Sequence, residues 1–123
     1  MSEVTTLVDR YIGMWNEPDA ARRRTLIAEI WTPDALYVDP MLRGEGRDGI
    51  SAMVGKVHDQ FPGHRFRRTS DVDGHNDHAR FAWALGPEDG APMVEGVDFA
   101  AIRDGRLAAV TGFFDTVPQA PQG

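Results

Sequence analysis

The sequence predicts an α+β fold in which helices cover one face of a curved sheet. Up to Phe61 the apolar residues follow helical spacing in three segments, with one short strand among them. From His64 onward the pattern changes to four strand-like runs separated by turn-forming segments. The 123 residues suffice for one domain with a core and not for two. We therefore expect a single domain over residues 1–117 and a loose tail over 118–123.

Apolar spacing defines the first two predicted helices. Apolar residues recur at intervals of three and four from Val4 to Trp15, and "NEPD" then breaks the pattern. Pro18 suits the first turn of a second helix, and Asp19 adds a negative charge near that helix N-terminus. We expect this helix to run to about Trp31, because "TPDA" follows and a proline disfavours helical geometry in the residue before it.

A strand and a third helix come next. The strand runs from Ala35 to Asp39, and Pro40 ends its hydrogen-bond ladder. "RGEGRDG" reads as a turn-rich loop, after which the apolar residues from Ile50 to Phe61 predict a helix that Pro62-Gly63 stops.

The second half of the chain predicts an antiparallel meander. Its four strands are expected over about Arg65 to Val72, Ala79 to Leu85, Pro92 to Ile102 and Leu107 to Val117. Asp104-Gly105 is the strongest hairpin signal, because both central residues of such a tight turn need positive φ.

Composition excludes several classes of protein. The absence of cysteine excludes a disulfide framework, a thiolate metal site and a cysteine nucleophile. The formal net charge of -6 opposes generic attraction to nucleic acid. No apolar run has the length of a signal peptide core or a membrane span. We expect a cytoplasmic protein that binds neither nucleic acid nor membrane.

Three polar side chains fall on faces that the pattern assigns to the interior, where a polar group needs a partner. Tyr11 lies in the apolar stripe of the first helix, although a core tyrosine whose hydroxyl reaches water would look the same. Asp39 shares a strand face with Tyr37, and an aspartate that caps the turn before Pro40 is the alternative. Asp98 lies mid-strand, so it pairs with a cation or has a raised pKa.

Together these residues suggest proton transfer. A carboxylate in an apolar cavity can serve as a base of useful strength, or as an acid that stays protonated at neutral pH. A tyrosine hydroxyl and a neutral carboxylic acid that face one oxygen would stabilise an oxyanion. A second, ionised carboxylate could then remove a proton from the carbon next to that carbonyl.

Around these residues the sequence resembles the ketosteroid isomerase branch of the nuclear transport factor 2-like superfamily, which also contains the SnoaL-like polyketide cyclases. The resemblance extends from about Val8 to Asp115. "VDRYIGMWN" is similar to the family's first helix, which assigns the oxyanion-hole tyrosine to Tyr11. "WTPDALYVDPM" is similar to the segment with the catalytic aspartate, which assigns the general base to Asp39. "GVDFAAIRDGRLAAVTGFFD" is similar to the strand with the second oxyanion-hole acid, here Asp98.

This resemblance implies a cone-shaped fold, with three helices on the concave side of a curved mixed or antiparallel sheet. It implies an apolar pocket, a homodimer formed through the sheet, and no metal or organic cofactor. The expected activity is isomerisation or cyclisation of an apolar ketone, steroid-like or polyketide-like. An epoxide hydrolase or dehydratase in the same pocket, and a non-catalytic module for ligand binding or dimerisation, are the alternatives.

Further candidates surround this set. His64, at the start of its strand, is a possible second acid or base, with a surface position as the alternative. Asp115 ranks below Asp39 as a catalytic carboxylate, and the arginines at 65, 67 and 68 could neutralise a buried acid. The His-rich turn at 75–78 could in principle bind a metal, but we expect no metal site. The candidate pocket-wall residues, with plain core as the alternative, are Met14, Trp15, Phe61, Phe66, Phe81, Trp83, Met93 and Phe113.

Overall fold

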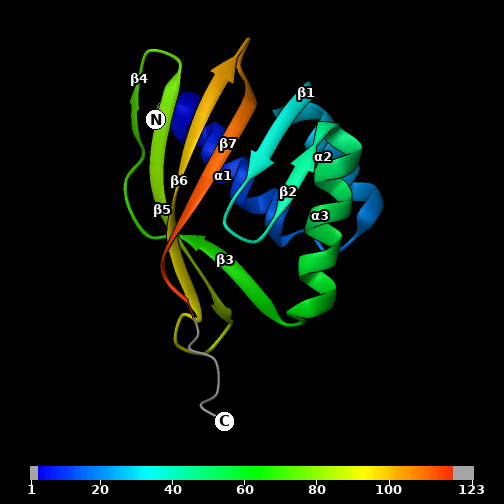
Figure 1. Ribbon diagram of the computed structural model, residues 1–123, viewed down its shortest axis with the longest axis vertical. Coiled ribbons are helices and arrows are strands. Elements are labelled where there is room, and N and C mark those ends of the chain that lie inside the picture. Colours follow the sequence, from blue (N-terminus) through cyan, green and yellow to red (C-terminus); the bar gives the residue numbers. More distant parts are fainter. Residues whose placement is uncertain (1–2, 118–123) are drawn as a thin grey trace.

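The computed structural model describes residues 3–117, which form three helices and one curved, open sheet (Figure 1). In chain order the elements are α1 (Glu3–Asn16), α2 (Ala20–Ile30), β1 (Trp31–Val38), β2 (Arg43–Glu45), α3 (Gly46–Gln60), β3 (His64–Arg68), β4 (Asp73–His75), β5 (His78–Pro87), β6 (Val94–Arg103) and β7 (Arg106–Thr116).

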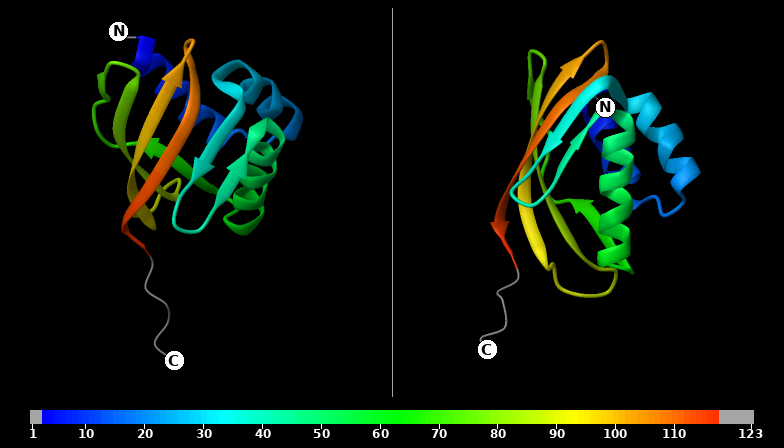
Figure 2. Two further views of the ribbon diagram at one scale, coloured as in Figure 1. Left: turned by 45° about the horizontal axis from the view of Figure 1, so that its top comes forward. Right: turned by 45° about the vertical axis from the view of Figure 1, so that its right-hand side comes forward.

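The strands follow the order β2-β1-β7-β6-β5-β3, and β4 pairs with β5 beside β3. β1 is parallel to β7, and the other neighbours are antiparallel. Figure 2 shows the helices on the concave side of the bent sheet. The predicted α+β fold is therefore confirmed, and the predicted meander is present as β3, β5, β6 and β7.

Helix α2 begins and ends close to the predicted positions. Asp19 is its N-cap, and the carboxylate accepts a hydrogen bond of 2.8 Å from the backbone N–H of Arg22. Pro18 therefore precedes the helix. At the other end Trp31 takes extended geometry and begins β1 without a loop, four residues before the strand that the sequence predicts. Its fully buried ring packs 5.8 Å from the ring of Tyr11.

Two short strands were not predicted. β2 lies in the segment that reads as a loop, and it pairs with the end of β1. β4 lies in a segment that reads as a turn, and it pairs with β5. Each has three residues and no apolar alternation, so neither carries the usual strand signal. Helix α3 begins at Gly46, four residues before the predicted Ile50.

The hairpin between β6 and β7 takes the expected turn. Asp104 and Gly105 have φ values of 55° and 77°, as the Asp-Gly signal requires. The hairpin aligns the two strands so that Asp98 lies opposite Gly112. Within residues 3–117, no helix combines the length and apolarity needed to cross a membrane. The tail predicted over 118–123 lies outside the described residues.

The C-terminal end of α1 is fastened to the edge of the sheet. The Asn16 side chain accepts a hydrogen bond of 2.7 Å from the Phe66 N–H and donates one of 2.8 Å to the Phe66 carbonyl. The buried Arg23 donates to the carbonyl of Glu17 at 2.7 Å. Next to the Asn16 bonds, the rings of Trp15 and Phe66 lie 5.0 Å apart, and both line the site described next.

Candidate active site

Asp98 is a carboxyl group buried inside the curve of the sheet. It lies on β6 between Phe81 of β5 and Gly112 of β7, and it is 3% exposed. The Tyr11 hydroxyl donates a hydrogen bond to its Oδ2 at 2.7 Å, and the Trp83 indole N–H donates one to its Oδ1 at 2.9 Å. Burial raises the pKa of Asp98 to about 7, although both hydrogen bonds lower it by stabilising the charged form. The negative charge of Asp39 raises it further.

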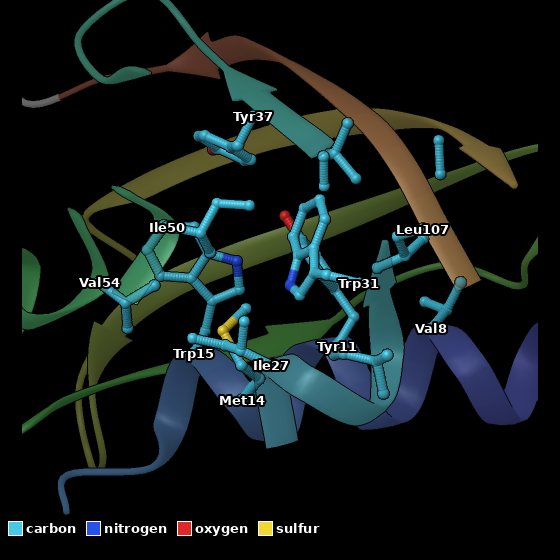
Figure 3. Packing of buried hydrophobic residues seen from close by; sticks show 14 of the residues in the cluster. Val8, Tyr11, Met14, Trp15, Ile27, Trp31, Tyr37, Ile50, Val54 and Leu107 are labelled. Carbon is cyan, nitrogen blue, oxygen red and sulfur yellow. The ribbon is translucent and has the colours of Figure 1, made fainter. Parts of the chain in front are cut away.

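Tyr11 connects α1 to this carboxyl. Figure 3 shows Tyr11 and Trp15 extending from α1 into the space beneath the sheet. The Tyr11 ring makes edge contacts with the rings of Trp15, Trp31 and Phe81. Burial and the Asp98 charge raise the pKa of Tyr11 well above its ordinary value, so this hydroxyl acts as a hydrogen-bond donor and not as a base.

Asp39 both caps a turn and faces a pocket. Its Oδ1 accepts hydrogen bonds from the backbone N–H groups of Met41 and Leu42, each at 2.8 Å. Its Oδ2 accepts one from the Tyr37 hydroxyl at 2.6 Å. Asp39 therefore caps the turn, as one interpretation of the sequence expects. The same hydrogen bonds fix the direction of its carboxylate, so this role is compatible with a position beside a pocket.

Tyr37 is a member of the site that the sequence interpretation left without a role. It is 3% exposed, and burial together with the charges of Asp98 and Asp39 raises its pKa well above the ordinary value. The signal was present in the alternation of the predicted strand from Ala35 to Asp39, in which residues 37 and 39 share a face, although β1 itself ends at Val38.

Gly112 gives the two carboxyl groups room to approach each other. A Cβ atom at this position would lie 2.8 Å from Oδ1 of Asp98 and 3.1 Å from Cβ of Asp39. It would also lie 3.4 Å from the Tyr37 hydroxyl oxygen. The absence of a side chain on β7 thus permits the Tyr11–Asp98 pair and the Tyr37–Asp39 pair to form one cluster.

The carboxylate of Asp39 borders a mostly apolar pocket of about 80 Å³, here called the outer pocket. It reaches the surface at Met41, which is 77% exposed. Its lining residues are Trp15, Tyr37, Asp39, Met41, Leu42, Val57, Gln60, Phe61, Phe66, Trp83, Leu85, Val94 and Phe114. Deeper in the fold lies a void of about 10 Å³, the inner void, lined by Tyr11, Ile12, Trp15, Tyr37, Phe66, Trp83 and Asp98.

A protein-family comparison matches this chain with the SnoaL-like domain over residues 8–110. The chain belongs to the SnoaL-like family. The match covers most of α1, of the pocket lining and of the sheet, and it confirms the resemblance inferred from the sequence. A comparison with curated proteins gives no match.

Solved structures agree with this SnoaL-like assignment. A candidate isomerase of the family from Agrobacterium tumefaciens is 38% identical, with a TM-score of 0.89 over 94% of this chain and 100% of that one. A candidate ketosteroid isomerase from Kribbella flavida is 22% identical, with a TM-score of 0.69 over 98% and 84% of the two chains. A candidate polyketide cyclase from Sinorhizobium meliloti is 17% identical, with a TM-score of 0.70 over 91% and 99%. The last two show a shared fold.

The SnoaL-like pocket contains half of the predicted wall residues. Trp15, Phe61, Phe66 and Trp83 line it. Met14 and Phe81 are buried in the core, and Met93 is half-buried outside the lining, where its N–H bonds to the Leu85 carbonyl at 2.7 Å.

Phe113 lies on the outer face of the sheet and is 54% exposed. Gly112 faces inward, and adjacent residues of a strand point to opposite faces, so Phe114 lines the pocket in place of Phe113.

The remaining candidates lie away from both carboxyl groups. His64 bonds through Nδ1 to the Pro62 carbonyl at 3.1 Å and stacks near Phe61, outside the pocket lining. Asp115 is exposed, and Arg68 pairs with Asp9 at 2.9 Å. Within residues 3–117, neither Asp39 nor Asp98 forms an ion pair, and no group of three potential metal ligands gathers.

The burial of Asp98 predicts a pH-dependent stability. Its folded pKa of about 7 exceeds the reference value of 3.8, so between these values the folded state holds a proton that the unfolded chain releases. Asp98 therefore lowers the free energy of unfolding progressively as the pH rises from about 4 to about 7. Asp98→Asn removes this titration, so the stability of the variant relative to the unmodified chain should rise by roughly 4 kcal/mol between pH 4 and pH 8.

Urea unfolding at the two pH values measures this difference. Asp115→Asn, at an exposed position on β7, is the control for loss of one charge. A stability difference for Asp98→Asn that stays constant with pH would contradict a titrating carboxyl in the interior.

Proposed function

We propose that this SnoaL-like chain is a cofactor-independent isomerase or cyclase that acts on a small apolar ketone. The observation that carries the proposal is the position of Asp39. Its carboxylate is the acidic group of a mostly apolar pocket, and two backbone N–H groups and the Tyr37 hydroxyl fix its direction. A carboxylate oriented in this way is suited to remove a proton from a bound carbon acid.

The inner void supplies a place for the substrate oxygen. About 10–15 Å³ holds one water-sized group, so a void of about 10 Å³ suits a single carbonyl oxygen. Such an oxygen would meet the Tyr11 hydroxyl and the carboxyl of Asp98, while the carbon skeleton remains in the outer pocket. The Tyr11 hydroxyl, whose proton would turn from Oδ2 of Asp98 to the substrate, and a protonated Asp98 carboxyl would be the donors that a developing enolate needs.

The proposed reaction is balanced without a cofactor. The Asp39 carboxylate removes a proton from the carbon next to the carbonyl, and the electron pair of that C–H bond becomes the enolate. In an isomerisation, protonated Asp39 returns the proton to another carbon of the substrate. In a cyclisation, the enolate carbon attacks a second carbonyl of the same molecule, and the resulting alkoxide takes the proton.

The alternative activities receive less support from the geometry. An epoxide hydrolase or dehydratase in this pocket would need an arginine or histidine inside it, and the lining contains neither. In a non-catalytic binding module with the same pocket, Asp39 would serve only as the cap of the turn at Met41 and Leu42.

Asp39→Asn tests the proposal. Because the amide cannot accept the proton, turnover should fall by about a hundredfold or more while the fold is kept. The assay is deuterium exchange and double-bond migration of 3-cyclohexenone in D₂O, followed by proton NMR. Asp115→Asn is the matched control and should keep the rate. A near-normal rate for Asp39→Asn would refute the assignment of the base.

We also propose that two copies of the chain associate through the outer face of the sheet. Phe99 and Phe113 are 44% and 54% exposed there, with their rings in edge contact at 5.7 Å. Adjacent exposed aromatic rings favour burial by a partner, and the family resemblance implies this mode. Phe113→Glu should convert a dimer to a monomer in sedimentation velocity. A monomeric unmodified chain at all accessible concentrations would contradict the proposal.

A further inference from the structure

Four side chains border both the outer pocket and the inner void, and Trp83 is one of them. Trp83 lines both of them, together with Trp15, Tyr37 and Phe66. The wall between the two spaces therefore consists of side chains. Trp83 differs from the other three because it also bonds to the carboxyl at the back of the inner void, Asp98.

Several contacts hold the indole in this position. Its N–H donates to Oδ1 of Asp98 at 2.9 Å, and its ring lies 5.7 Å from Phe66 and 5.9 Å from Phe114. The residue is 5% exposed. If the indole turned away from this position, it would lose the hydrogen bond and both aromatic contacts. These interactions therefore favour the observed position.

A glycine on the neighbouring strand β6 leaves room for the indole. Gly96 of β6 lies opposite Trp83 of β5 in the sheet register. A Cβ atom at Gly96 would lie 2.7 Å from Cζ2 of the indole, closer than such contacts allow. The same Cβ would lie even closer to the backbone oxygen of Phe113, so the backbone of β7 and the indole together leave room only for glycine at position 96. The indole therefore packs directly over the backbone of β6.

The resulting volumes limit what can bind. The outer pocket holds about 80 Å³ and the inner void about 10 Å³. A cavity of about 150 Å³ is known to enclose benzene, so these two spaces do not enclose even one whole ring. A bound ring must extend from the outer pocket toward the surface at Met41, and the indole limits how far it can enter.

We propose that Trp83 determines substrate size in this protein, and that the substrate is a single-ring or short-chain ketone of which only the oxygen passes the indole. This inference rests on the proposed function, because it concerns the substrate of the same pocket. As long as the indole keeps its bond to Asp98, a fused-ring ketone reaches the inner void less readily than a single-ring ketone.

Binding of phenol and 2-naphthol tests the proposal without any need for turnover. Both carry one hydroxyl, and they differ by one fused ring. Isothermal titration calorimetry should show that the unmodified chain binds phenol at least tenfold more tightly than 2-naphthol. Trp83→Ala joins the two spaces and should shift this ratio at least tenfold in favour of 2-naphthol. Trp83→Phe, which keeps a buried ring, should shift it less.

Trp31→Phe is the matched control, because Trp31 is a buried tryptophan that lines neither space. It should leave the ratio unchanged. Circular dichroism establishes folding, and if Trp83→Ala fails to fold, Trp83→Phe carries the test with a smaller expected shift. An unchanged ratio in the folded Trp83 variants, or failure of both ligands to bind to them, would overturn the proposal.

The two proposals fail separately. An unchanged ratio in the Trp83 variants would leave Asp39 as the base. Normal turnover of Asp39→Asn would remove the proposed reaction but leave the selectivity between phenol and 2-naphthol intact.

Discussion

The site depends on the burial of one carboxyl group inside the sheet. An ionised carboxylate in an apolar interior destabilises a fold unless donors surround it, and Asp98 has one donor for each oxygen. Those donors come from α1 and β5, so the carboxyl also ties a helix to the strands that it covers. The competition between burial and hydrogen bonding leaves the pKa of Asp98 near neutrality.

The carboxyl group of Asp39 influences Asp98 because Gly112, which has no side chain, leaves room for the two groups to lie close together. The charge of Asp39 raises the pKa of Asp98, so an ionised Asp39 favours a protonated Asp98. This is the combination that the proposed reaction needs at its start, with a base in the outer pocket and an acid at the inner void. Once Asp39 has taken a proton, its charge disappears and Asp98 releases its own proton more readily.

Much of this arrangement could be predicted from residue pattern. Helical spacing located α1 and placed Tyr11 on its buried face, and the position of Asp98 in the middle of a predicted strand indicated its burial. The Asp-Gly turn fixed the hairpin that aligns β6 with β7. Each of these features depends on residues that are close together in the chain, so the residue pattern predicts it directly.

The parts that could not be predicted depend on contacts between distant segments. The indole N–H of Trp83 meets Asp98 across a strand pair, and nothing in the local pattern distinguishes this tryptophan from a core residue. Phe113 and Phe114 are adjacent aromatic residues, and only the register with β6 decides which of them faces the pocket. Tyr37 gains its role from the hydrogen bond to Asp39, which requires the turn at Met41 and Leu42.

The central claim is that Asp98 is a buried acid that changes protonation near neutral pH. The most direct measurement is a pH titration of its side-chain carboxyl carbon by ¹³C NMR in the unmodified chain, with Asp98→Asn used to assign the signal. The account predicts a midpoint near pH 7. A midpoint near 4, typical of an exposed aspartate, would contradict it.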